Sequence, residues 1–445
     1  MNSVDKITEI VSKLKGKWTS LLDTEWIERE CVVSGHSWRD RILTPGVTVR
    51  LFLLQILHGN TSCSHLRHLS EVAFSAASYC NARKRLPLEL FEQLVAQTTN
   101  CINADIPHAG LWQGHRVWLG DGSGCSMPDT DELREYFGQP GSQKPGCGFP
   151  VAHLLALMNC QTGMLHKVVV SPLNTHDLSK ASELSTELHR EDILVLDRGF
   201  CSSALILELT AQQVHSVIRV SSGHKVDFRR AKRDAETGIR RRRVEKLGRY
   251  DQIVEWHKSL TCPPWMNEQE FENLPDFVLL REIRYQLDPK GYRGEEVTLV
   301  TTLLDPKKYS RIALIKLYGM RWEIETNFRH LKISMGMDVL KAKTVLGVKK
   351  EICIFALAYN LVRQAMLEQA NSRGVPLKQL SFSDTLRWLF AENTKSKPLI
   401  NPYRPGRKVP RVTKRRPKAY PRMTSRRKNS CGIAPEVMEL QQLGA

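Results

Sequence analysis

The stretch between residues 115 and 220 constrains the fold most, because the spacing of its apolar residues alternates between strand and helix patterns. Strand-like segments cover "HRVWLGDGS" (115–123), "PVAHLLALMN" (150–159) and "MLHKVVVSP" (164–172). A helix is expected at 177–190, a strand within "DILVLDRGF" (192–200), a helix at 202–213 and a strand at "HSVIRV" (215–220). This order of three strands, helix, strand, helix and strand predicts an α/β domain built on one sheet.

The same order is the layout of a ribonuclease H-like core, in which two carboxylates lie on neighbouring strands. We expect Asp121 to end the first strand and Asp197 to end the fourth. Taken alone, each aspartate has an ordinary structural explanation. An aspartate before a glycine is typical of a turn, and Asp197 could cap a helix or pair with Arg198.

Residues 222–296 interrupt this core. Their arginine-rich start, an irregular segment at 261–276 and an alternating segment at 277–287 predict a mainly β insertion. A core strand is then expected at 297–305, followed by helical sequence to residue 332 and a buried helix at 345–370. The core is therefore predicted in two parts, 113–221 and 297–391.

Both ends of the chain are basic in character. Residues 1–112 read as a helical DNA-binding domain with Arg83, Lys84 and Arg85 near its end, although helical bundles with a basic corner are common. Residues 392–445 have no acidic side chain between Asn393 and Pro435 and predict a basic, largely disordered tail. The net charge of +18 favours a polyanionic partner, with double-stranded DNA as the first candidate.

Membrane and disulfide classes are disfavoured. No apolar run approaches the roughly 20 residues of a spanning helix, and residues 1–18 lack the apolar stretch of a signal peptide. The 11 cysteines include no C-x-x-C pair, which argues against a zinc module or a disulfide framework. A cytoplasmic protein is expected.

One helical segment, "YGMRWEIETNFRHLK" (318–332), carries a polar stripe. On a helix that turns about 100° per residue, Tyr318, Arg321, Glu325 and Lys332 fall on one side. Glu323 points to nearly the opposite side. The spacing therefore selects Glu325 as the carboxylate that faces the same direction as the basic groups, although a solvated polar face is the usual explanation for such a run.

Three acidic residues then form a candidate site: Asp121, Asp197 and Glu325. Carboxylates from two adjacent strands and from a helix packed on the sheet can hold two divalent cations about 3.5–4 Å apart. Such a pair of ions serves phosphodiester cleavage. The stripe of Tyr318, Arg321 and Lys332 would hold DNA phosphates beside the ions.

The spacing Tyr-x2-Arg-x3-Glu-x6-Lys in this helix resembles the Tyr-Arg-Glu-Lys motif of DDE transposases of bacterial insertion sequences, in their cut-and-paste branch. "LGDGS" (119–123) and "LVLDRGF" (194–200) are similar to the first and second aspartate regions of that family. "AFSAASYCNARKRLP" (73–87) and "RPGRKVPRVTKRRPKAYP" (404–421) resemble its terminal regions, so the likeness covers nearly the whole chain.

The resemblance implies a DNA transposase that binds the inverted terminal repeats of an insertion sequence, cleaves the element ends by two-metal hydrolysis and joins the 3′ ends to target DNA. It implies Asp121, Asp197 and Glu325 as catalytic metal ligands, Mg²⁺ as cofactor with Mn²⁺ as substitute, and a homodimer in the synaptic complex. A nucleoid-associated bacterial protein follows. Two alternatives stay open: an inactive transposase-derived DNA-binding protein, or a ribonuclease H-like nuclease selective for DNA structure.

Further DNA-binding candidates are arginines. Arg329 lies within the same helical segment. Arg240, Arg241, Arg242 and Arg243 form a run inside the insertion, where they would clamp phosphate near the site; a solvated charged face is the alternative.

Overall fold

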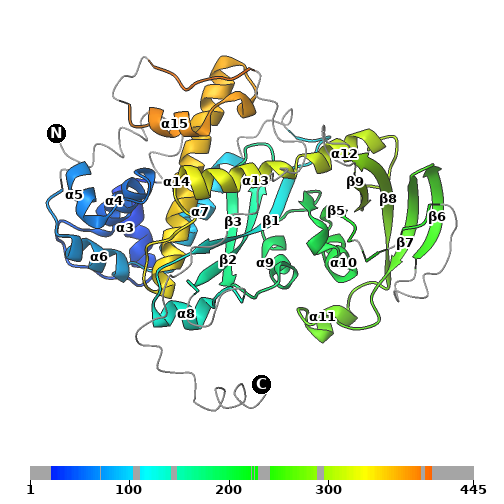
Figure 1. Ribbon diagram of the computed structural model, residues 1–445, viewed down its shortest axis with the longest axis horizontal. Coiled ribbons are helices and arrows are strands. Elements are labelled where there is room, and N and C mark those ends of the chain that lie inside the picture. Colours follow the sequence, from blue (N-terminus) through cyan, green and yellow to red (C-terminus); the bar gives the residue numbers. More distant parts are fainter. Residues whose placement is uncertain are drawn as a thin grey trace, which may run out of the picture.

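The computed structural model describes residues 22–70, 72–103, 111–141, 148–221, 223–224, 226–228, 241–287, 295–391 and 396–402. Within these residues, nine strands form one sheet in the order β3-β2-β1-β4-β5-β9-β8-β7-β6 (Figure 1). The strands are β1 (Val117–Ser126), β2 (Val151–Asn159), β3 (Leu165–Pro172), β4 (Ile193–Leu196), β5 (His215–Arg219), β6 (Arg241–Gly248), β7 (Asp251–His257), β8 (Phe277–Leu287) and β9 (Glu295–Thr301).

The sheet is mixed. β3, β2 and β1 form an antiparallel meander, whereas β1, β4 and β5 run parallel to one another. All four residues of β4, "ILVL", are buried, because a parallel strand in the middle of a sheet is covered on both faces. The α/β class and the order of the predicted strands between 115 and 220 are confirmed. The structure adds α8 (Asp131–Phe137) between β1 and β2, which was not predicted, and the helix expected at 177–190 ends at Ser185.

The segment predicted as a β insertion continues the same sheet. β9 pairs antiparallel with β5, and β8, β7 and β6 follow it outward to the edge. The short helix α11 (Glu268–Glu272) lies between β7 and β8 in the chain. The mainly β content is confirmed for the described residues, while the division into domains stays a prediction.

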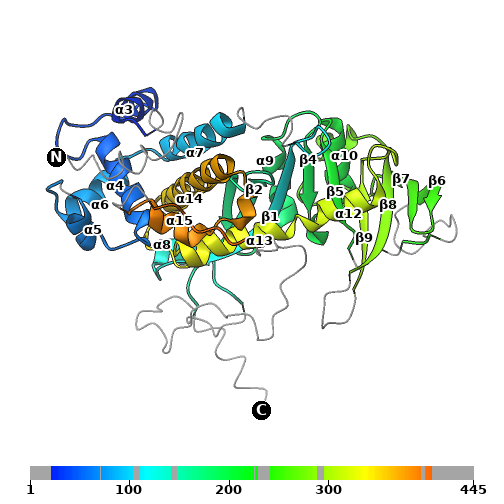
Figure 2. The ribbon, with the colours of Figure 1, turned by 90° about the horizontal axis from the view of Figure 1, so that it is seen from above.

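Helices from both ends of the chain pack together at one end of the molecule (Figures 1 and 2). The long helix α14 (Val345–Arg373) contacts α7 (Leu88–Asn103) and α4 (Pro45–Leu57). Buried side chains of these helices and of one face of the sheet form a single hydrophobic core. The other helices of the described N-terminal residues are α3 (Thr24–Val33), α5 (Cys63–Leu69) and α6 (Ala76–Arg85).

A second, smaller core covers the opposite face of the sheet around Leu155, Leu196 and Ile218. It includes side chains of α9 (Ala181–Ser185) and α10 (Ser203–Ala211). The sheet is thus a middle layer between two sets of helices. Other short elements of the described residues are α8 (Asp131–Phe137), η2 (Asp177–Lys180), η3 (Arg198–Phe200), η5 (Leu377–Gln379) and α15 (Phe382–Trp388).

The segment predicted as one helix up to residue 332 consists of three pieces. α12 (Arg311–Gly319) ends before α13 (Trp322–Arg329), and a π-helical turn follows at His330–Ser334. At the junction, the N–H of Arg321 donates to the carbonyl of Tyr318 at 3.0 Å, a shorter-range bond than the i→i−4 bond of an α-helix. α13 contacts β1, which brings this segment beside the first aspartate.

Among the described residues, no helix combines the length and apolar character needed to cross a membrane.

Candidate active site

The two aspartates lie at the same level on neighbouring strands. The parallel register of β1 and β4 pairs Leu119 with Val195. Asp121 comes two residues after Leu119 and Asp197 comes two residues after Val195, so the two aspartates lie at the same height along the sheet. The expectation that Asp121 ends its strand is wrong, because β1 continues to Ser126 through its antiparallel pairing with β2. Asp197 does follow the last residue of β4, as predicted.

The carboxylate of Asp197 also has the capping role that was the alternative explanation. Its Oδ1 accepts a hydrogen bond from the N–H of Gly199 at 2.7 Å and caps η3. The same side chain lines a cavity with Asp121 and Glu325. The cap therefore orients this carboxylate at the cavity wall.

Arg321 connects the strand to the helix. Its Nη1 lies 3.2 Å from Oδ2 of Asp121 and its Nη2 lies 3.7 Å from Oε1 of Glu325. The arginine side chain is only 5% exposed, and its guanidinium lies 3.9 Å from the ring centroid of Trp322. Two of the three candidate carboxylates therefore share one buried cation.

These groups surround a cavity of about 380 Å³. All three carboxylates line it, and the other lining residues are Arg198, Arg219, Glu295, Tyr318, Arg321 and Trp322. The cavity lies at the carboxyl ends of β4 and β5 and beside the middle of β1. It is large enough for a phosphate group with its ions and combines anionic and cationic walls.

The electrostatics of the cavity favour a bound cation. Burial raises the pKa of Asp121 to about 6, and the neighbouring charges of Asp197 and Glu325 act in the same direction. Arg321 and the N–H of Gly122 oppose this shift only in part. The negative charges of these closely spaced carboxylates repel one another, and this repulsion contributes to the raised pKa. A divalent cation such as Mg²⁺, which prefers oxygen ligands, would reduce the repulsion. Asp121, Asp197 and Glu325 could therefore hold such ions.

The sequence model of a known family, described as "Transposase DDE domain", matches residues 112–361 and includes all three carboxylates. This chain belongs to the DDE transposase family. The resemblance noted from the sequence is confirmed.

Two proteins of Escherichia coli (strain K12) are similar to this transposase. "Transposase InsG for insertion sequence element IS4" is 25% identical over 364 residues, 76% of each chain. "Putative transposase InsZ" is 29% identical over 196 residues, which is 42% of this chain and 65% of InsZ. A solved piggyBac transposase synaptic complex with hairpin DNA matches with a TM-score of 0.42 and 11% identity, over 86% of this chain and 79% of that chain.

The rest of the polar stripe of the transposase is divided between two places. Tyr318 lines the cavity, and burial raises the pKa of its hydroxyl to about 12, so that it stays protonated at neutral pH. Lys332 instead contacts β1, where its Nζ donates to Oγ of Ser123 at 3.3 Å and to the carbonyl of Gly124. Arg329 is exposed to solvent.

The two glutamates of α13 face different surroundings. Glu325 lines the cavity, whereas Glu323 does not. Burial raises the pKa of Cys160 and of Tyr359, and the charge of Glu323 acts on both in the same direction, which places Glu323 on the side of these two residues. The helical spacing therefore separated the two residues correctly.

Arg243, the described side chain of the arginine run at 240–243, does not line the cavity. Arg240 lies outside the described residues, and the other three belong to β6 at the edge of the sheet. Four strands, β5, β9, β8 and β7, separate β6 from β4. Nε of Arg243 donates to Oε1 of Gln252 on β7 at 2.9 Å.

Four lining residues were not selected from the sequence: Arg198, Arg219, Glu295 and Trp322. Arg198 and Trp322 directly follow Asp197 and Arg321, so proximity to the motif residues was a usable signal. Arg219 and Glu295 form an ion pair across 76 positions of sequence. No local pattern points to that pair.

Proposed function

We propose that this chain is a metal-dependent DNA transposase that binds the inverted terminal repeats of its insertion sequence, cleaves the element ends and joins the freed 3′ ends to target DNA. The observation that carries the proposal is the meeting of Asp121, Asp197 and Glu325 at one cavity, on β1, after β4 and on α13. The three elements support a ribonuclease H-like organisation of the catalytic core.

The carboxylates of Asp121, Asp197 and Glu325 would hold two divalent ions, Mg²⁺ or Mn²⁺. Bound ions of this kind lower the pKa of water and neutralise charge that develops on the phosphate during cleavage. The protein itself supplies the geometry. The register of β1 and β4 places two carboxylates at one level, and α13 supplies the third.

The cationic residues of the cavity would position the scissile phosphate. Arg198 and Arg219 line the cavity beside the carboxylates. Tyr318 keeps its proton because its pKa is about 12, so its hydroxyl can donate a hydrogen bond to a phosphate oxygen. Arg321 has the same proposed role, and its contacts to Asp121 and Glu325 add a second one, which is to hold these carboxylates together.

Sequence-specific binding is assigned to residues 1–112, and the basic residues 392–445 would add contacts to the DNA backbone. Two element ends must be held together for transposition, which implies a homodimer in the synaptic complex. The substrate is double-stranded DNA in the bacterial nucleoid. Lys332 and the arginines at 240–243 and 329 remain candidate phosphate contacts.

The decisive experiment incubates the full chain and Mg²⁺ with a plasmid that carries the inverted repeats of the element. Excision at the ends, followed by joining of the 3′ ends to a second plasmid, is expected. Binding to the ends without cleavage at any Mg²⁺ or Mn²⁺ concentration would instead indicate an inactive DNA-binding relative. Cleavage of branched DNA without preference for the ends would indicate a structure-selective nuclease.

A further inference from the structure

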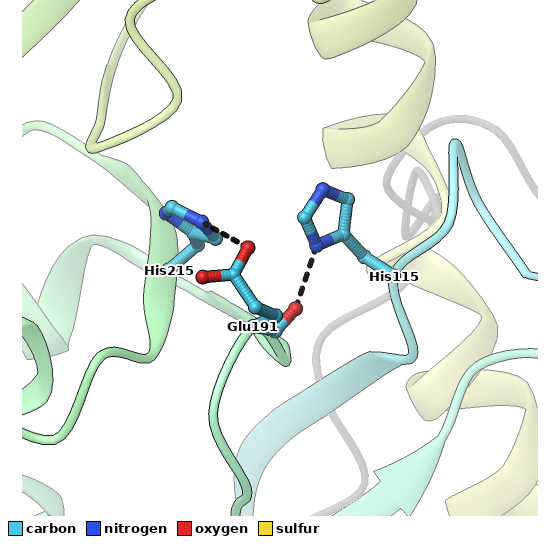
Figure 3. Close-up of side chains that lie close together, drawn as sticks. All are labelled: His115, Glu191 and His215. Atoms are coloured by element: carbon cyan, nitrogen blue, oxygen red, sulfur yellow. Dashed lines mark hydrogen bonds and ion pairs between the residues drawn. The ribbon is translucent and has the colours of Figure 1, made fainter.

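A second group of ligand-type side chains lies at the opposite end of the strands that carry the proposed active site. His115 precedes β1 by two residues, Glu191 precedes β4 by two, and His215 is the first residue of β5 (Figure 3). Because β1, β4 and β5 are parallel, their starting ends meet at one edge of the sheet. Along β5, this edge is roughly 13 Å from Arg219 of the cavity, at about 3.3 Å per residue.

The three side chains are close enough to share one ion. One ligand atom from each of them lies within 4.8 Å of the other two. Nε2 of His215 is 3.5 Å from Oε2 of Glu191, close to the separation of two ligands around a tetrahedral zinc ion. The rings of His115 and His215 stand edge to face, with centroids 5.4 Å apart.

Outer contacts hold both imidazoles in place. Nε2 of His115 faces the hydroxyl of Tyr309 at 2.7 Å, while its Nδ1 faces the carbonyl oxygen of Glu191 at 2.6 Å and is the nitrogen available to an ion once that contact is released. Nδ1 of His215 faces Oγ1 of Thr302 at 3.2 Å, which leaves Nε2 directed at Glu191. A hydrogen bond on the second ring nitrogen is the usual support for a metal-binding histidine.

The backbone of Glu191 gives an independent reason to expect a function. Its φ is 67°, which is uncommon for a residue that carries a side chain. The conformation is held by a hydrogen bond from its N–H to the carbonyl of Gln213 at 2.9 Å. Its side chain is 56% exposed, so an ion could reach the group from solvent. Unusual backbone conformations of this kind concentrate at functional sites.

We propose that His115, Glu191 and His215 form a zinc site that joins the starting ends of β1, β4 and β5 and is separate from the catalytic carboxylates. Two imidazoles and one carboxylate are a ligand set that suits Zn²⁺ more than Mg²⁺. Binding through Nδ1 of His115 would break its hydrogen bond to the Glu191 carbonyl and move the ring's proton to Nε2, which then donates to the Tyr309 oxygen. The proton stays on the ring, and water fills the remaining position on the exposed side.

The site would stabilise the fold instead of acting in cleavage. Tyr309 lies at the start of the segment that leads through α12 to α13. Zinc at this edge would therefore link three core strands to the loop before α12, the helix that precedes α13 and its Glu325.

The test uses the full chain after treatment with EDTA and dialysis. Zinc chloride is titrated in the presence of excess Mg²⁺, which occupies the catalytic carboxylates, and bound zinc and Tm are measured. One zinc per chain and a rise in Tm of a few degrees are expected. Glu191→Gln should weaken zinc binding by about tenfold or more and remove the rise in Tm. Because the side chain of Glu191 is exposed, this substitution should not unfold the protein, so a loss of zinc binding would reflect the loss of a ligand.

A matched control is Glu187→Gln, which alters another histidine–glutamate pair, His166 and Glu187, 3.3 Å apart. Zinc affinity should be unchanged in this variant. His215→Gln, checked for folding by circular dichroism, should lose zinc as Glu191→Gln does, and Co²⁺ should give a tetrahedral absorption spectrum only in the wild type and the control. Absence of zinc binding, equal binding in Glu191→Gln and wild type, or equal loss in Glu187→Gln would overturn the proposal.

Discussion

Nη1 of Arg321 lies 3.2 Å from Oδ2 of Asp121, although 200 positions of sequence separate the two residues. The same guanidinium also contacts Glu325. A cation that touches two proposed metal ligands reduces the repulsion between them, but it also repels a divalent ion bound by the same oxygens. Arg321 should therefore affect metal affinity and cleavage in opposite directions.

The first prediction follows for Arg321→Ala. Removing the cation should lower the Mg²⁺ concentration needed for half-maximal cleavage, because the carboxylates lose a competing positive charge. At saturating Mg²⁺, single-turnover cleavage of a pre-bound element end should still fall by about 10²-fold, because carboxylates and phosphate are less well positioned. A Mg²⁺ titration of the single-turnover rate measures both effects.

Arg321→Lys is the control, because lysine keeps the charge and loses the planar fork that reaches both carboxylates. Its Mg²⁺ dependence should stay close to that of the wild type, with a reduced maximal rate. If both variants cleave at the wild-type maximal rate and differ only in Tm, Arg321 has a purely structural role.

A second prediction concerns the three carboxylates. Asp121→Asn, Asp197→Asn and Glu325→Gln should each lower cleavage by roughly 10³-fold or more, since each removes a charged ligand worth several kcal/mol of transition-state stabilisation. Binding to the element ends, measured by gel shift, should remain near normal. Glu323→Gln is the matched control, because Glu323 lies on the same helix and does not line the cavity. Equal loss in Glu323→Gln and Glu325→Gln, in folded protein, would contradict the assignment.

The third prediction is a pH dependence of stability in the absence of divalent ions. The pKa of Asp121 is raised from 3.8 to about 6 in the folded chain. The folded state therefore holds this proton more tightly than the unfolded state, and stability is lost as pH rises through the interval from about 4 to about 6. Asp121→Asn cannot ionise and avoids this loss.

In EDTA, Asp121→Asn should accordingly melt at a higher temperature than the wild type at pH 8, and the difference should disappear near pH 4. Added Mg²⁺ should stabilise the wild type at pH 8 and narrow the gap. A constant difference in Tm across this pH range would show that Asp121 ionises normally in the folded protein.

The sequence predicted those parts of the site that depend on local pattern. Apolar runs indicated β1 and β4. Asp121 and Asp197 were selected because each is an acidic residue directly after such an apolar run or close to its end. Helical spacing distinguished Glu325 from Glu323 because the 100° rotation persists within α13 even though the predicted long helix is broken before it.

The parts that depend on tertiary pairing could not be predicted in this way. The first strand was expected to end at Asp121, because the residues that follow are rich in glycine and polar side chains, but pairing with β2 continues it to Ser126. The ion pair of Arg219 and Glu295 needs β5 and β9 to be neighbours, which no local spacing encodes. Arg321 was expected to face DNA, and its contact to Asp121 exists only because α13 packs on β1.

Lys332 gives the fourth prediction. Its Nζ donates to Ser123 and Gly124 of β1, so Lys332→Ala should leave a carbonyl of the strand without this partner. A loss of about 1–3 kcal/mol in the free energy of unfolding is expected. Ser123→Ala, which removes only one of the two contacts, should cost less. A Lys332→Ala protein of unchanged stability but reduced DNA binding would show that the lysine serves the DNA and not β1.

The last prediction concerns Arg219 and Glu295, which form an ion pair at the wall of the active-site cavity. Glu295 is 48% exposed and Arg219 is 15% exposed. If Arg219 binds a DNA phosphate, Glu295 must give up this partner when DNA enters. Glu295→Gln should then tighten binding of an element end by a few-fold, mainly through faster association, and the gain should shrink as salt rises.

Glu296→Gln is the matched control for this prediction. Glu296 pairs with Arg284 at 3.3 Å and lines the neighbouring cavity without lining the active-site cavity. The two variants remove the same charge from adjacent residues of β9, so a general electrostatic effect would appear in both. A gain confined to Glu295→Gln, together with weaker binding and slower cleavage in Arg219→Ala, would place Arg219 on the phosphate. An equal gain in DNA affinity in the two glutamate variants would mean that affinity depends only on the net charge around the start of β9. Arg219 would then have no specific contact with a phosphate.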